Sequence, residues 1–158
     1  MDEIVARAIA LCGHVGQRDR VGESVIEHVQ RVAGGVPEPA RATAWLHDLL
    51  ERTDTDPERL TEQGLGRVER EALGLLTRGA GESFELHVLR IVHAPGPAGT
   101  LARTVKLADL EDHILRERAG SVAAHAPPYG WARRHLLARA AVPRLGTEPL
   151  MPLGTMSG

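Results

Sequence analysis

The side chains in this sequence that are best suited to chemistry are histidines and carboxylates in three separate segments. His28 lies in the first segment, the adjacent residues His47 and Asp48 lie in the second, and Asp109 lies in the third. Imidazole nitrogens combined with carboxylate oxygens suit divalent ions such as manganese, iron or zinc. The same residue types also occur as surface or hydrogen-bonded core groups, so their spacing alone leaves both interpretations open.

Three further polar residues would share helix faces with these candidate ligands. Glu51 follows the His-Asp pair by three and four residues, which predicts a position from which it could orient or deprotonate a metal-bound water. Lys106 and His113 flank Asp109 at −3 and +4, again on one face. Lys106 can equally form a simple salt bridge with Asp109. His113 can be an extra metal ligand, a hydrogen-bond donor to a substrate, or a residue that points away.

The composition limits the class of function. The chain has 158 residues, a net charge of −2 and one cysteine, Cys12, which excludes an intramolecular disulfide and a cysteine-based zinc knuckle. Only 3% of the residues are aromatic, so rows of base-stacking rings are not expected, and the net charge of −2 argues against a dominant basic groove. The acidic start, the interruption by Arg7 and the lack of an apolar run of about 18 residues fit neither a secretory signal nor a membrane span. We therefore expect a soluble cytoplasmic protein.

Helical periodicity indicates the elements that position these residues. Valine and isoleucine recur at helical spacing among Ala, Leu, Arg and Glu, and strand signals are nearly absent. We expect helices at about 2–12, 23–33, 38–51, 56–63, 66–78, 83–93, 98–118 and 129–141. The fold prediction is a single all-α, bundle-like domain at 1–141, followed by a Pro/Gly-rich tail at 142–158 that is loosely held.

Four segments occur in the order found in a known family. They read HVGQRDRVGESVIEHVQRVA, AWLHDLLERTDTDPERL, LGLLTRGAGESFELHV and ARTVKLADLEDHI, within about residues 4–116. Together they resemble the HD-domain hydrolase half of RelA/SpoT-type alarmone enzymes and of their small stand-alone relatives.

The resemblance implies an all-α HD fold that holds one divalent ion, typically manganese, with iron or zinc as alternatives. The four candidate ligands match the family's ligand positions one by one. Glu51 matches an acid that serves the attacking water, so it is expected to act in catalysis together with the ligand Asp48. Arg20 takes the place of a basic residue that contacts the nucleotide. His14 and Gln17 match motif positions whose role is structural.

Two substitutions near the reacting groups depart from the family's pattern. Arg52 stands where the family has a second acid, and His113 stands where it usually has asparagine. Arg52 can be a phosphate clamp that acts with Arg20 and Lys106, or a surface residue at a helix C-terminus, where a cation is favourable. The other histidines match no motif and are expected at the surface: His87, His93, His125 and His135.

The expected function is therefore that of a metal-dependent phosphohydrolase acting on a nucleotide-like phosphate or pyrophosphate ester, with (p)ppGpp as one candidate. The alternative is a catalytically weakened HD domain that binds a nucleotide or a partner protein. A helical DNA-binding domain is disfavoured by the acidic balance and by the lack of an arginine-lined recognition helix. The expected partner is a small-molecule phosphate or nucleotide, with neither a nucleic acid nor a membrane.

Overall fold

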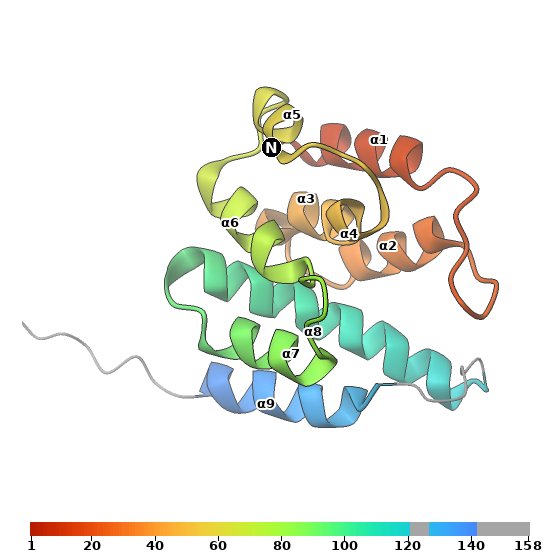
Figure 1. The fold of residues 1–158 in the computed structure, drawn as a ribbon, viewed down its shortest axis with the longest axis vertical. Helices are drawn as coiled ribbons and strands as arrows, with labels where there is room; N and C mark the ends of the chain where they lie inside the picture. Colours follow the sequence, from red (N-terminus) through yellow and green to blue (C-terminus); the bar gives the residue numbers. More distant parts are fainter. Residues whose placement is uncertain (121–126, 142–158) are drawn as a thin grey trace, which may run out of the picture.

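The fold of the described residues is all-α, as the sequence predicts. The structure is a computed structural model that describes residues 1–120 and 127–141 (Figure 1). Within these ranges it has no strand, and its helices are α1 (Glu3–Gly13), α2 (Val25–Gly34), α3 (Glu38–Leu46), α4 (Leu49–Arg52), α5 (Pro57–Glu62), α6 (Arg67–Leu76), α7 (Phe84–His93), α8 (Gly96–Arg118) and α9 (Tyr129–Ala141). The predicted loosely held tail, 142–158, and His125 lie outside the described residues.

Several helix starts follow from local capping chemistry. The Asp2 side chain accepts hydrogen bonds from the first backbone N–H groups of α1, and the Ser83 hydroxyl does the same for α7. Asp56 caps α5 in the same way, and Pro57 occupies the first helical position, where its missing N–H costs nothing. These signals lie within a few residues of each helix, so the sequence alone indicates where the helices begin.

The prediction of one helix at 38–51 is wrong, because the chain breaks it into α3 and α4 at His47 and Asp48. The His47 ring nitrogen Nδ1 hydrogen-bonds to the carbonyl oxygen of Ala44 at 2.8 Å, and the backbone N–H of His47 lies 3.5 Å from the same oxygen. A side chain that competes for a backbone acceptor interrupts the helical ladder. The break places both candidate ligands at a corner between two helices.

The long helix α8 is the central element. It packs against α2, α3, α6, α7 and α9, and Figure 1 shows it crossing the molecule between α2 and α6 on one side and α7 and α9 on the other. The core around it is aliphatic, and each fully buried Leu or Ile contributes about 1.5–3 kcal/mol relative to exposure. Its largest members include Leu46, Leu49, Leu73, Ile91, Val105, Leu110 and Leu136.

A tight turn sets the position at which α8 starts. Gly96 has φ +70°, and a Cβ on Gly99 would lie 2.2 Å from the carbonyl oxygen of Ala94. The Arg103 guanidinium donates to the carbonyl oxygens of Ala94 at 2.6 Å and of Ile91 at 3.3 Å, which satisfies the C-terminal end of α7. The α7–α8 corner is therefore packed too closely for a side chain at Gly99.

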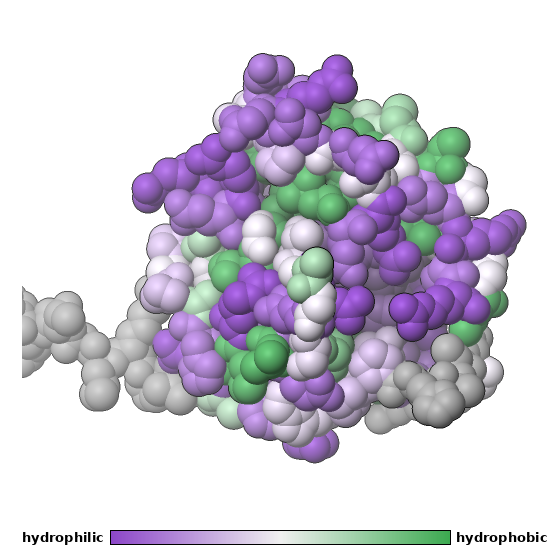
Figure 2. Space-filling view, viewed as in Figure 1, coloured by the Kyte–Doolittle hydropathy of each residue, from purple (hydrophilic) through white to green (hydrophobic). Residues whose placement is uncertain are grey.

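The surface of the described residues is mostly polar, with small apolar areas between charged side chains on the face drawn in Figure 2. In the part of the chain that the structure describes, no helix is both long enough and apolar enough to cross a membrane.

Candidate metal centre

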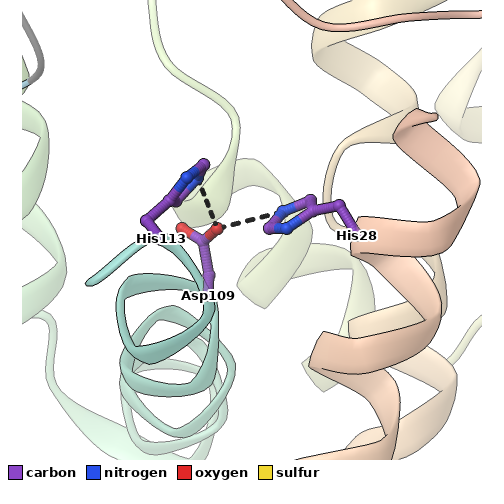
Figure 3. A group of neighbouring side chains, drawn as sticks. All are labelled: His28, Asp109 and His113. Carbon is purple, nitrogen blue, oxygen red and sulfur yellow. Dashed lines mark ion pairs between the residues drawn. The ribbon is translucent and has the colours of Figure 1, made fainter. Parts of the chain in front are cut away.

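Three parts of the fold bring five metal-binding side chains together. His28 comes from α2, His47 and Asp48 from the α3–α4 break, and Asp109 and His113 from α8. Donor atoms of His28, Asp109 and His113 lie within 4.8 Å of one another, as do those of His28, His47 and Asp48. Asp109 Oδ1 lies 3.2 Å from His28 Nε2 and 3.9 Å from His47 Nε2. The four predicted ligands thus lie close together. Figure 3 shows His113 beside two of them, His28 and Asp109.

His47 presents a nitrogen that fits a metal ion. Its Nδ1 lies 2.8 Å from the carbonyl oxygen of Ala44, which can only accept, so Nδ1 carries the proton and Nε2 carries the lone pair. Nε2 is buried 3.5 Å from Asp48 Oδ1 and has no hydrogen-bond partner within residues 1–120 and 127–141. Burial lowers the pKa of His47 and keeps the ring neutral. A buried lone pair directed at carboxylates is the arrangement that a ligand histidine needs.

His28 is held between two carboxylates. Its Nε2 faces Asp109 at 3.2 Å, and its Nδ1 lies 2.8 Å from Asp112 Oδ2. Burial lowers the pKa of His28, but the hydrogen bonds to Asp109 and Asp112 outweigh it and raise this pKa to about 9. The ring is therefore protonated at neutral pH in the metal-free protein and would lose that proton on binding a cation.

Asp112 is a site residue that the sequence analysis missed. Besides His28, it contacts the Arg31 guanidinium, with Nε 2.5 Å from Oδ1 and one terminal nitrogen 3.1 Å from Oδ2. Burial raises the pKa of Asp112, but His28 and Arg31 hold it well below its usual range. Asp112 follows Asp109 by three residues and so shares its helix face, which is the feature of the sequence that could have indicated its place in the site.

Arg52 forms an ion pair with a predicted ligand. Its Nε lies 2.6 Å from Asp48 Oδ2, one helical turn away. Burial raises the pKa of Asp48, but electrostatic interactions with His47, Arg52 and His28 lower it to about 2. The Arg52 side chain is 41% exposed, so its guanidinium borders both the site and the solvent.

The Glu51 carboxylate pairs with Arg78, in the segment between α6 and α7. Its Oε2 accepts a hydrogen bond from the Arg78 N–H at 3.1 Å, and its Oε1 lies 3.7 Å from the Arg78 guanidinium. The expected shared face of Glu51 and the His-Asp pair assumed a continuous helix, which the break at His47 removes. The catalytic role of Glu51 stays a prediction.

The other two predicted cations are Lys106, which contacts the cluster, and Arg20. Lys106 Nζ is 2.8 Å from Asp109 Oδ2, which is the salt bridge that the spacing allowed. Burial raises the pKa of Asp109, but Lys106, His113 and His28 hold it well below its usual range. Arg20 is exposed in the loop between α1 and α2, and its positive charge acts to lower the pKa of Tyr129.

An aromatic stack, formed by His113, Tyr129 and Phe84, extends from the candidate site. The rings of His113 and Tyr129 are parallel within 4°, with centroids 4.7 Å apart, and Phe84 meets Tyr129 edge to face at 5.8 Å. Burial and the charge of Asp109 raise the pKa of Tyr129 to about 12, so its hydroxyl stays neutral. Tyr129 reaches the site only because α9 docks on α7 and α8, which no local pattern indicated.

His14 and Gln17 form contacts in the loop before α2. The buried His14 ring contacts the Gln17 side-chain oxygen at 3.0 Å. The Gln17 amide in turn donates to the carbonyl oxygens of Gly13 and Arg52. These bonds tie the loop to the end of α4.

The surface position expected for His87 is wrong. His87 is buried on α7, and its Nδ1 lies 3.4 Å from Glu82 and 3.1 Å from the Arg90 guanidinium. It lies one helical turn before the buried Ile91, on the same side of α7, so its burial follows from helical spacing. His93 is exposed as expected, and His135 is partly buried, with its ring centroid 4.2 Å from that of Trp131.

Comparison of the chain with models of known protein families and with curated proteins gave no match. The case for a metal centre therefore depends on its geometry: five converging donor residues, an unpartnered imidazole nitrogen on His47, and a second carboxylate behind His28.

Proposed function

We propose that this protein is an HD-type, metal-dependent phosphohydrolase that acts on a nucleotide-like phosphate or pyrophosphate ester, with (p)ppGpp among the candidates. The observation that carries the proposal is the buried lone pair of His47 Nε2. It lies beside the carboxylates of Asp48 and Asp109 and has no hydrogen-bond partner in the described part of the chain. A divalent ion, manganese, iron or zinc, would supply Lewis acidity toward a phosphoryl oxygen and lower the pKa of a water molecule.

The chain's own residues divide the work between holding the ion and orienting its ligands. His28, His47, Asp48 and Asp109 would hold the ion, since their donor atoms already converge. Asp112 would hold the His28 ring through Nδ1 and leave Nε2 directed at the site.

The cations around the site would bind the phosphate oxygens of the substrate. Arg52 and Lys106 now neutralise Asp48 and Asp109. When those carboxylates share their charge with an ion, the guanidinium and ammonium groups can turn to phosphate oxygens, which they bind through charge-assisted hydrogen bonds. Arg20, exposed in the loop before α2, would add a third positive group.

Glu51 would orient the attacking water or remove its proton. It is the first acid after the ligand pair, and its carboxylate is exposed. To act in this way, it must leave the backbone N–H of Arg78, a single hydrogen bond at the surface. An exchange of that bond for one to water costs little, because both partners remain solvated.

The same contact favours the second candidate function, a catalytically weakened domain that binds a nucleotide or a partner protein. Glu51 is bound to Arg78, and Arg52 stands where the hydrolases that the sequence resembles have a second acid. Both features reduce the negative charge available to activate a water. A domain with an intact ion site and no free base would bind phosphate esters without cleaving them.

The test is an assay of the purified protein loaded with manganese, iron or zinc. Phosphate and pyrophosphate release are measured over a nucleotide panel that includes guanosine tetraphosphate. We expect turnover of at least one member, its loss in Asp48→Ala together with the ion, and no change in Asp54→Ala, an exposed acid nearby. Nucleotide binding without turnover would establish the binding-domain alternative, and failure to bind any divalent ion would overturn the metal centre.

A further inference from the structure

His113 and His28 contact the same oxygen atom from two helices. His113 Nε2 lies 3.2 Å from Asp109 Oδ1, the same distance that separates His28 Nε2 from that oxygen. Figure 3 shows the two imidazole rings directed at Asp109 from different sides, one from α8 and one from α2.

The donor separations fit a single ion. With bonds of about 2.1 Å, neighbouring ligands of an octahedral ion lie about 3.0 Å apart and opposite ligands about 4.2 Å apart. The two histidine contacts to Asp109 Oδ1 measure 3.2 Å, and those of His47 Nε2 to Asp48 and Asp109 measure 3.5 and 3.9 Å. All four distances fall between the two limits. Within 4.8 Å the five donor residues form two triads that share His28, one with Asp109 and His113 and one with His47 and Asp48.

The His113 ring is held in this orientation by its neighbours. Its stack on Tyr129, with centroids 4.7 Å apart, fixes the ring plane, and the His28 ring lies nearby at 4.9 Å. Among the described residues Asp109 is its ion-pair partner, and the side chain is 30% exposed. Rotation of the ring away from the site would break the stack, so α9 takes part in aiming Nε2.

We propose that His113 is a fifth protein ligand, so that the ion is held by three imidazoles and two carboxylates. This inference rests on the proposed function and deepens it. Three imidazoles favour iron, cobalt or zinc over manganese, because imidazole nitrogen suits the later ions and manganese prefers oxygen donors. Five protein ligands also leave one of six positions for a water or a substrate oxygen.

The first test counts the ligand histidines directly with cobalt(II) as the probe. Each cobalt-bound imidazole gives a strongly shifted, exchangeable ring N–H signal in the proton NMR spectrum. We expect three such signals in the native protein, two in His113→Asn and three in His93→Asn, whose histidine is exposed on α7. Two signals in the native protein, unchanged in His113→Asn, would overturn the proposal and leave the four-ligand centre intact.

The second test compares the affinities of zinc(II) and manganese(II) by chelator competition. His113→Asn should weaken zinc binding at least about tenfold and manganese binding less, because an imidazole has been lost. An equal loss for both ions would show that His113 acts only through the fold, and would overturn its role as a ligand. A native protein that binds neither ion would instead overturn the proposed function itself.

Discussion

At the scale of single residues, the orientation of His28 depends on Asp112. The carboxylate lies 2.8 Å from His28 Nδ1 and is itself fixed by two contacts to Arg31. Because Nδ1 is used in this way, Nε2 is left for the site, and the negative charge makes the ring a better donor to a cation. Asp112 is therefore a positioning residue, which acts on an ion only through His28.

Asp112→Asn tests this role. The amide keeps the shape of the carboxylate but loses its charge, so we expect metal affinity to fall by about 10–100-fold. Isothermal titration of the metal-free protein measures the change. Glu111→Gln is the matched control, since this neighbouring acid is exposed and pairs with Arg133 on the surface. Equal affinities for Asp112→Asn and the native protein would show that Asp112 does not position the ring.

The candidate site could be anticipated only in part. The resemblance grouped His28, His47, Asp48 and Asp109, which the fold does bring together. It said nothing of Tyr129, which follows Pro128 and reaches the site through the docking of a helix far along the chain. Local spacing in the sequence does not indicate which residues a distant helix brings to the site when it packs.

At the scale of elements, helix ends with local causes could be predicted, and the interruption between α3 and α4 could not. The start of α5 depends on Asp56 and Pro57, which are adjacent in the sequence. The interruption arises because the buried His47 side chain hydrogen-bonds to the Ala44 carbonyl oxygen. An exposed histidine could bind water instead, and the sequence does not indicate which of the two occurs. The helical periodicity of residues 38–51 therefore predicted one continuous helix, where the structure has two.

The corner between α7 and α8 gives a test with two glycines. Gly99→Ala should destabilise the protein by about 2 kcal/mol or more, because its Cβ would lie 2.2 Å from the Ala94 carbonyl oxygen and the backbone would have to shift. Gly74→Ala on α6 has open space and should stabilise by about 0.5–1 kcal/mol. Urea denaturation measures both changes, and similar effects for the two variants would contradict the close approach.

A polar clasp, formed by Glu82, His87 and Arg90, ties the loop before α7 to the end of α6. The Arg90 guanidinium lies 2.9 Å from both Glu82 oxygens and donates to the carbonyl oxygen of Thr77 at 3.0 Å. The ion pair with Arg90 lowers the pKa of Glu82 to about 2. Burial and the charges of Lys106 and Arg90 lower that of His87 to about 4.

Both shifts predict a loss of stability in acid. A neutral His87 is favoured by folding, so stability should fall from the ordinary histidine pKa of 6.5 down to about pH 4. The Glu82 contribution is present above its ordinary pKa of 4.5 and is lost as the pH falls toward 2. In Glu82→Gln the urea midpoint should be lower at pH 7 and should vary less between pH 4.5 and 2. Glu85→Gln, an exposed acid on α7, should keep the native profile.

At the scale of the whole molecule, the site joins separate parts of the fold around α8. Its donors come from α2, from the α3–α4 break and from α8, and they are brought together only by folding. An ion would therefore bind the folded state and not the unfolded state. At a free ion concentration of 100 times Kd, such binding adds about 2.7 kcal/mol to the free energy of unfolding. For a chain of this size that corresponds to a rise in Tm of roughly 5–11 °C.

Removal of the ion should reverse this stabilisation. Dialysis against a chelator is expected to lower the Tm of the native protein, and added manganese or zinc should restore it in a concentration-dependent way. Differential scanning calorimetry measures the shift. Asp48→Ala should show the same Tm with and without chelator, and a chelator effect of native size in that variant would place the ion elsewhere.

The bond between His28 and Asp112 joins residues 84 positions apart. A contact with so long a loop forms only after α8 has docked, so the ion would bind late on the folding pathway. Its stabilisation would then appear in the unfolding rate, while the folding rate changes little. The half-life of the protein against proteolysis under strongly degrading conditions would follow the supply of the metal.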